Sequence, residues 1–247
     1  MIRLFLHVSI FLFLTILSQL GGLAWLFALC FKRRAVVFVA AYIALSVSAL
    51  WLAPLLGREP LPCMSGHVLQ MQSKLFCALN RQYVVPELEE VLIDYATHME
   101  SEFPGTVTRL LDANFPYLSG FPLAPHLSHD DGRKVDLAFY YEGAGGYLPG
   151  VAKSPLGYFA FEDGPSDCPG NAASLRWDMP WLQGLWPDYR PEPSRMKAAL
   201  HWLGKDHRVG KVFIEPHLKA RFAAQSQKVR FQGCRAARHD DHIHVQL

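Results

Sequence analysis

The sequence predicts an α+β fold, in which a small antiparallel sheet with flanking helices is preceded by two transmembrane helices. Three observations support this prediction. Residues 1–56 are almost uncharged, the rest of the chain mixes helical and strand patterns, and these patterns lack the regular βαβ alternation of a parallel sheet. The 247 residues suffice for one domain of ordinary size and a smaller additional segment.

Two apolar runs, about residues 4–31 and 35–56, make up a predicted membrane anchor over residues 1–56. Each run is long enough to cross a bilayer about 30 Å thick at about 1.5 Å per helical residue. The basic triplet Lys32-Arg33-Arg34 between them favours the cytoplasmic side. We therefore expect a two-pass protein of the inner (cytoplasmic) membrane, with its large domain on the periplasmic or extracytoplasmic side.

A cleaved signal peptide is the alternative for the first run, because Arg3 is followed by an apolar stretch of suitable length. After the second run, a cluster of glycine, proline and charged residues ends the hydrophobic region. We predict a linker over residues 57–62 and a domain over residues 63–247.

Within this domain, residues 86–103 show helical spacing of apolar side chains, a proline in the first turn and acidic residues near the N-terminus. Residues 134–141 alternate as in a strand, so Asp136 faces away from Val135 and Leu137. Residues 142–193 are rich in glycine, proline and aromatic residues and predict long loops. The other predicted elements are strands over 106–111, 211–214, 228–232 and 239–246 and helices over 192–203 and 216–223.

The domain holds four cysteines, an even number in a compartment expected to be oxidising. They allow two disulfides in three pairings, of which we favour Cys63 with Cys77 and Cys168 with Cys234. Buried free thiols are the alternative. The formal net charge of +2 is small and the basic residues are scattered, so the sequence does not predict a nucleic-acid partner.

Two histidine-containing motifs carry the candidate chemistry. The first is Ser128-His129-x-x-Gly132-x-x-Val135-Asp136, where an Asp-Gly turn separates a histidine from an acidic residue at the start of a strand. The second, near the C-terminus, is His239-Asp240-Asp241-His242-x-His244-Val245, and His242 and His244 project from the same face of a strand. A charged hairpin tip and an exposed pH-sensitive patch are the plainer interpretations.

Together the two motifs resemble the penicillin-insensitive murein endopeptidases. These belong to a wider group with the lysostaphin-type enzymes, the D-Ala-D-Ala metallopeptidases and the hedgehog signalling domain. The resemblance covers about residues 106–247 loosely and is specific only at the motifs. It implies an α+β peptidase domain of that group, with Zn²⁺ held by His129, Asp136 and His244. It also implies that His242 and His239 belong to the active site.

Two departures favour the endopeptidase branch. Asp241 stands where the D-Ala-D-Ala branch usually has a glutamate, and Ser128 lies one residue before the first ligand rather than two. Two histidines and a carboxylate leave one zinc position open for a water molecule, which the metal activates at neutral pH. A nearby group must still carry a proton. Of the candidates His242, Asp241 and His239, strand parity favours His242.

The expected function is thus a membrane-anchored zinc metallopeptidase that hydrolyses an amide bond in peptidoglycan peptides. One alternative keeps the metal but changes the substrate, as in a D,D-carboxypeptidase or a protein-directed metallopeptidase. Another is a non-catalytic, zinc-stabilised module that binds the cell wall.

Other side chains carry less specific expectations. Arg109 and Arg133 could bind a substrate carboxylate, although solvated surface charge is the ordinary role of such residues. Trp177 and Trp181 could line a substrate groove, or anchor a long loop. His126 and His217 have no partner in the sequence pattern, so we predict structural roles for both.

Overall fold

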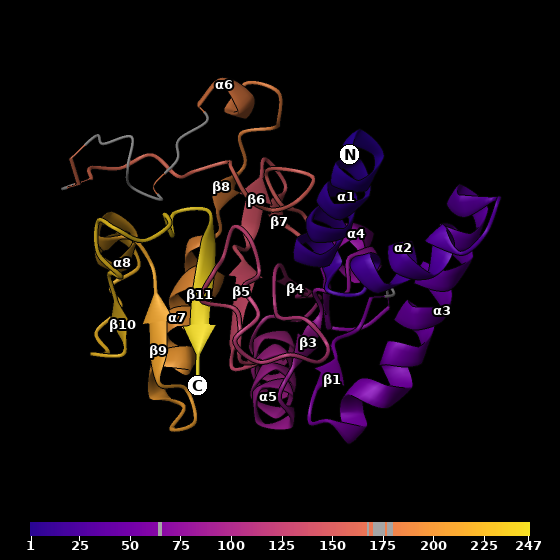
Figure 1. Cartoon of the computed structure of the whole chain (residues 1–247). Coiled ribbons are helices and arrows are strands. Elements are labelled where there is room, and N and C mark those ends of the chain that lie inside the picture. The colour runs from indigo at the N-terminus through magenta and orange to yellow at the C-terminus, as the bar shows by residue number, and fades with distance from the viewer. Residues whose placement is uncertain (64–65, 167, 170–175, 177–179) are drawn as a thin grey trace.

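The computed structural model describes residues 1–63, 66–166, 168–169, 176 and 180–247, and it has a mixed α+β fold. Figure 1 shows three helices at the N-terminus beside a domain built around a mixed sheet. The helices are α1 (Ile2–Ser18), α2 (Gly21–Leu29), α3 (Arg34–Leu55), α4 (Lys74–Ala78), α5 (Pro86–Glu102), α6 (Pro180–Gln183), α7 (Pro193–Lys205) and α8 (Pro216–Arg221). The strands are β1 (Glu59–Pro60), β2 (Leu69–Met71), β3 (Tyr83–Val84), β4 (Thr108–Leu110), β5 (Lys134–Ala138), β6 (Tyr141–Gly143), β7 (Gly146–Leu148), β8 (Arg190–Pro191), β9 (Lys211–Phe213), β10 (Val229–Arg230) and β11 (His242–Gln246).

The central sheet has the strand order β10-β9-β11-β5-β4-β2. Its middle strands pair antiparallel, as predicted, but β2 with β4 and β9 with β10 pair parallel. A parallel pair needs a crossover connection, and α5 lies in the connection from β2 to β4. Two further small sheets, β1-β3 and β7-β6-β8, are seen among the described residues.

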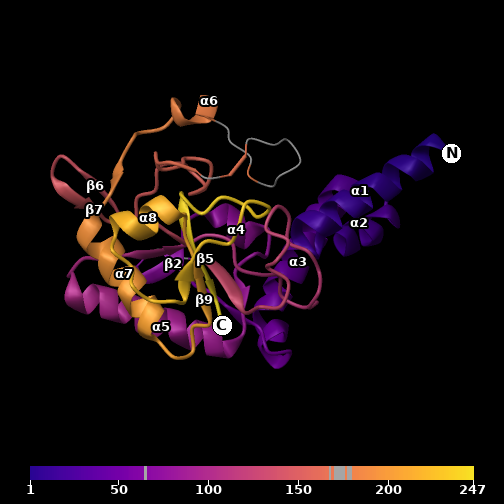
Figure 2. The same cartoon turned by 90° about the vertical axis from the view of Figure 1, so that its left-hand side faces the viewer.

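One face of the central sheet packs against α5 and α7, which lie next to each other in Figure 2. Val135 and Leu137 of β5 and Ile243 and Val245 of β11 point into this core and are at most 1% exposed. Because strand side chains alternate, the intervening residues of both strands face the opposite side. The sheet therefore offers its second face, away from the helices, to Asp136 and the histidines of β11.

Two predicted strands have different bounds in the structure. The strand predicted over residues 134–141 is divided into β5 and β6, which belong to different sheets. The strand predicted over residues 239–246 begins only at His242, because the three preceding residues lie in a loop. His239 therefore lies outside the strand whose alternation was used to choose among the candidate proton carriers.

The first predicted membrane span is two helices rather than one. α1 ends at Ser18, Gln19 adopts a φ of 58°, and α2 begins at Gly21, whose N–H donates to the Ser18 hydroxyl. A Cβ on Gly22 would lie 1.9 Å from Thr15 Oγ1, so glycine allows α2 to fold back closely on α1. Among the described residues only α3 is long and apolar enough to cross a membrane, and α1 is shorter. The two-helix anchor is therefore not confirmed.

The N-terminal helices are bonded to the domain. The Tyr42 hydroxyl of α3 donates to the Ala78 carbonyl at 2.7 Å, and Asn80 Nδ2 donates to Tyr42 and to Ser46. Tyr83 of the domain packs in a cluster with Leu20 and with two alanines of α3. The predicted linker is likewise ordered, since β1 within it pairs with β3. The N-terminal helices and the domain thus form a continuous packed structure.

Both favoured disulfides are present, Cys63–Cys77 and Cys168–Cys234, and Cys30 is a free cysteine. The first closes a short segment with a sequence separation of 14, whereas the second joins residues 66 apart. A cross-link restricts the unfolded chain more when it closes a longer loop.

We expect replacement of Cys168 and Cys234 by serine to lower the free energy of unfolding by about 4 kcal/mol, and replacement of Cys63 and Cys77 by about 3 kcal/mol. Chemical denaturation of the full chain in detergent, without reductant, measures both values. Equal losses, or a larger loss from the Cys63–Cys77 pair, would contradict this loop-length argument.

Candidate metal centre

Strand register places Asp136 and His244 side by side. The two residues are direct partners in the antiparallel pairing of β5 with β11. His129 comes from the loop before β5, where Gly132 adopts a φ of +80° and donates its N–H to the Asn114 side chain. This turn, predicted from the Asp-Gly sequence, returns the chain so that His129 lies beside Asp136.

The donor atoms of these three residues touch one another. His129 Nε2 lies 3.3 Å from Asp136 Oδ1 and 3.1 Å from His244 Nδ1, and His244 Nδ1 lies 2.7 Å from Asp136 Oδ1. The three residues are at most 3% exposed. Ligand atoms around a tetrahedral zinc ion at about 2.0 to 2.1 Å are about 3.3 Å apart. The observed triangle is therefore of the right size for one small cation.

The hydrogen-bond partners of the two rings differ. His129 Nδ1 lies 2.7 Å from the Ala113 carbonyl, which can only accept, so this nitrogen carries a hydrogen and Nε2 faces the cluster. The Gln246 side-chain amide nitrogen lies 2.9 Å from His244 Nε2 and can only donate, so Nε2 accepts and the His244 Nδ1 hydrogen is directed at Asp136 Oδ1. A cation bound at the cluster would displace this hydrogen from His244 Nδ1.

His126 is a fourth member of the cluster that the sequence analysis missed. Its Nδ1 lies 3.3 Å from Asp136 Oδ2 and 3.1 Å from Asp112 Oδ2. His126, His129 and Asp136 offer donor atoms that all lie within 4.8 Å of one another. The structural role predicted for His126 is thus incomplete. Only its spacing of three residues from His129 could have pointed to it.

Tyr158 and Asp112 also border the cluster without any signal in the sequence. The Tyr158 hydroxyl donates to Asp136 Oδ2 at 2.6 Å and accepts from the Asp112 N–H at 3.0 Å. Arg81 forms an ion pair with Asp112 at 2.7 Å. Tyr158 and His126 thus occupy one oxygen of Asp136, while the other oxygen faces His129 and His244.

The C-terminal motif adds a second layer to the site. His242 Nδ1 contacts Asp241 Oδ1, and Asp241 Oδ2 accepts from the Phe159 N–H at 2.7 Å. His242 Nε2 faces the cluster, 3.7 Å from Asp136 Oδ1. The His239 ring lies 4.9 Å from that of His242, and its Nδ1 has no hydrogen-bond partner among the described residues. All three predicted catalytic residues therefore border the cluster.

Burial and the central carboxylate separate the protonation states of these rings. Burial would lower the pKa of His242, but Asp136 and Asp241 outweigh it and raise the pKa to about 9. Burial lowers the pKa of His244 to about 4 in spite of Asp136. Burial would raise the pKa of Asp136, yet the neighbouring imidazoles hold it well below its ordinary value. Without a metal, protonation is therefore favoured on His242 and disfavoured on His244.

The predicted substrate-binding residues are not brought to the cluster. Arg109 donates to the Met71 carbonyl at 3.3 Å, and Arg133 pairs with Glu87 at 3.0 Å on the surface. Trp181 lies on α6 and is 71% exposed. Trp177 lies outside the described residues.

His217, predicted as structural, has its pKa lowered by burial.

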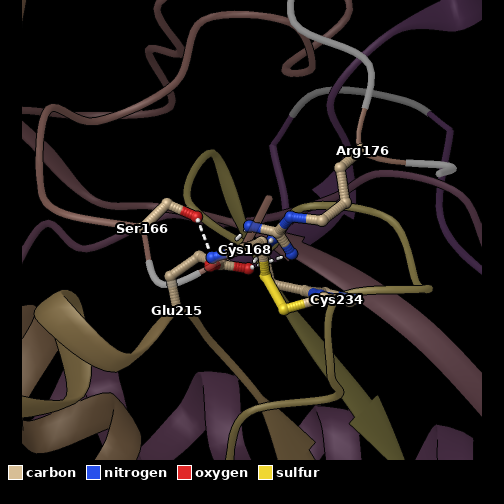
Figure 3. The surroundings of a disulfide bond; sticks show 6 residues. Ser166, Cys168, Arg176, Glu215 and Cys234 are labelled. Atoms are coloured by element: carbon tan, nitrogen blue, oxygen red, sulfur yellow. Dashed lines mark hydrogen bonds and ion pairs between the residues drawn. A yellow bond between two sulfur atoms is a disulfide. The ribbon is translucent and has the colours of Figure 1, made fainter. Parts of the chain in front are cut away.

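A disulfide and an ion pair hold the segment that leads into β11. Figure 3 shows Glu215, which lies just before α8, facing Arg176 next to the Cys168–Cys234 disulfide. Arg176 donates to both Glu215 oxygens, at 3.1 and 2.7 Å, and Glu215 Oε1 also accepts from the His239 N–H at 3.3 Å. The loop carrying His239 is thus fixed to the start of α8.

A cavity of about 490 Å³ opens beside the cluster. Its polar end is formed by residues of the site, and the rest of its wall is mainly apolar. The site residues that line it are His126, Tyr158, Asp241 and His242. The cluster therefore has a space next to it that can admit a small organic group.

The sequence was compared with protein-family models and with curated proteins. No protein-family model matches the chain, and no curated protein matches it at a significant level. The resemblance of the two motifs to the murein endopeptidases remains an expectation from the sequence, and the arrangement of the cluster is an independent observation.

Proposed function

We propose that the protein is a zinc-dependent amide hydrolase, a metallopeptidase, with His129, Asp136 and His244 as the metal ligands. The mutual contact of their three donor atoms, from a loop and two strands, carries this proposal. A zinc ion held there would supply an activated water molecule at neutral pH and polarise the carbonyl group of an amide. His126 is the competing ligand, but its Nδ1 already pairs with the carboxylates of Asp112 and Asp136.

In this proposal His242 is the proton carrier. Its Nδ1 is held by Asp241, which is itself fixed by the Phe159 N–H, so the ring has one orientation. Its Nε2 is directed at the cluster and at the end of the cavity. A protonated His242 can stabilise a negatively charged oxygen that develops during attack, and can return a proton to the leaving amine. Asp241 is then a positioning residue, and His239 is a neutral neighbour.

The substrate class and the location follow from the sequence. The two motifs favour an amide bond in peptidoglycan peptides, and two disulfides with an apolar N-terminal helix favour a membrane-held, extracytoplasmic domain. Lys32 and Arg33 lie between α2 and α3, Arg34 is the first residue of α3, and this triplet would stay on the cytoplasmic side in a two-pass arrangement. Membrane, peptide substrate and zinc are thus the partners of this proposal.

We expect the purified full chain to hold about one zinc ion, and Asp136→Asn and His244→Ala to lower zinc affinity at least about tenfold, because each removes a direct ligand. Metal analysis after dialysis against a weak chelator measures this. His98→Ala, on the exposed side of α5, is the matched control. Loss of zinc in His126→Ala together with retention in His244→Ala would show that the other triad binds the metal.

Zinc affinity is expected to fall as the pH is lowered from about 8 to about 6, by up to about tenfold per pH unit for each proton displaced. Burial would lower the pKa of His129, but Asp136 outweighs it and raises the pKa, so this ligand is increasingly protonated as the pH falls. Competition with a chromophoric chelator across this pH range measures the slope. A pH-independent affinity would exclude a histidine ligand with a raised pKa.

Loss of His242 should slow hydrolysis strongly without releasing the metal. For His242→Ala we expect a decrease in kcat of about 10² to 10⁴ with zinc content unchanged, because a proton carrier is removed and no ligand is. Digestion of purified murein with product analysis gives the rate. It also separates cross-link cleavage, expected from an endopeptidase, from release of free D-Ala. Full activity of a zinc-loaded His242→Ala protein would rule out this role.

A further inference from the structure

The cavity beside the metal cluster has an apolar wall that a polar murein peptide does not require. Four segments form the wall: α4, the loop before His129, the loop around Tyr158 and the segment leading into β11. Its apolar residues are Leu75, Phe76, Leu79, Ala124, Pro125, Leu127, Leu156, Phe159, Phe161 and Ala237. The remainder is lined by Arg81, Asp112, His126, Tyr158, Arg238, Asp241 and His242. One end of the cavity therefore holds the candidate catalytic side chains, and the larger apolar part suits a hydrocarbon group.

Two of the four wall segments are connected to the N-terminal helices. The first, α4, ends at Ala78, whose carbonyl accepts from Tyr42 of α3 at 2.7 Å. The second is the loop before His129. Earlier in the same loop, outside the cavity wall, the Tyr117 N–H donates to Gln19 Oε1 at 3.1 Å, between α1 and α2. Tyr42 lies about 12 Å from the start of α3, at about 1.5 Å per residue, within the apolar part of the helix. The cavity walls thus lie beside a helix of membrane-spanning length.

Exposed leucines continue from the cavity toward the same helices. Leu75 and Leu127, both in the cavity wall, are 47% and 54% exposed, and Leu118, next to the Gln19 contact, is 59% exposed. Contiguous exposed apolar surface on a folded domain marks contact with a membrane or another apolar partner. Leu75 lies on α4, which is bonded to α3, and the Leu118 N–H is bonded to Gln19 between α1 and α2. Because the exposed leucines lie on segments connected to these apolar helices, the favoured surroundings are lipid.

From these observations we infer that the substrate is a membrane-resident amphiphile, whose straight acyl chain enters the cavity from the lipid and places an amide bond at the metal cluster. The inference rests on the proposed amide hydrolysis and changes the form of the substrate, from polymeric wall to a lipid-attached amide. In the reaction, water is the co-reactant and the C–N bond breaks. The carbonyl carbon gains the hydroxyl oxygen, the amine leaves with a proton, and the products are a carboxylate and an amine.

The first test compares substrates that differ only in an acyl cap. Murein stem peptides carrying acetyl, octanoyl or dodecanoyl groups are presented to the full chain in detergent micelles, and cleavage is followed by mass spectrometry. Each methylene that enters the cavity is expected to raise kcat/KM about fourfold, from roughly 0.8 kcal/mol per buried CH₂, until the cavity is full. Cleavage of the acetyl peptide at the same rate as the dodecanoyl peptide would overturn the inference and leave the proposed function standing.

The second test measures binding without catalysis. The probe is dansylated undecanoic acid, whose fluorescence rises on entering an apolar site, titrated against the full chain. Ala237→Trp, which fills the cavity, and Leu127→Gln, which makes its mouth polar, are each expected to weaken saturable binding at least about tenfold. Ile93→Gln, at an exposed position on α5, is the matched control for non-specific binding to surface leucines and anchor helices.

The two tests distinguish failure of the acyl-chain inference from failure of the proposed hydrolysis. Saturable binding that is lost in Ala237→Trp, with no amide cleaved by the zinc-loaded protein, would support an apolar ligand site and disprove the proposed hydrolysis. Binding that is equal in the native chain, Ala237→Trp and Leu127→Gln would show that the probe sits elsewhere, and would overturn the inference whatever the activity.

Discussion

The pairing of β5 with β11 is the constraint on which the site depends. It makes Asp136 and His244 direct neighbours on the sheet face that the core helices do not cover, while Val135, Leu137, Ile243 and Val245 secure the register from the other face. A slip of one residue would send every one of these side chains to the opposite face. The buried carboxylate of Asp136 then collects the imidazoles around it. Its charge is compensated on one oxygen by Tyr158 and His126, and on the other by His129 and His244.

Much of the domain was predictable because its signals are local. The α5 helix, the alternation of β5 and the Asp-Gly turn before it are all confirmed, and so are both disulfide pairings. Local sequence signals do not predict strand pairing or strand bounds where tertiary contacts determine them. The parallel pairing of β2 with β4 is set by the crossover through α5, and the start of β11 at His242 is set by contacts of the preceding loop with Glu215.

The parts of the site that the sequence did not predict are those with no pattern in the chain. Tyr158 and Asp112 reach Asp136 from segments distant in sequence. His126 pairs with Asp112 and Asp136, and its ring packs against that of Tyr158. The break of the first apolar run at Gln19 was also missed. There, a hydroxyl, an amide and two glycines allow a tight reversal within a stretch that is otherwise uniformly apolar. Composition predicts such a stretch to be one helix, whereas close backbone contact ends it.

The most direct test of the central claim is anomalous diffraction at the zinc absorption edge from crystals of the full chain grown with zinc. The account predicts one strong peak within bonding distance of His129 Nε2, Asp136 Oδ1 and His244 Nδ1, about 2.0 to 2.2 Å from each. A peak bound through His126 instead of His244, or zinc bound only away from Asp136, would contradict it.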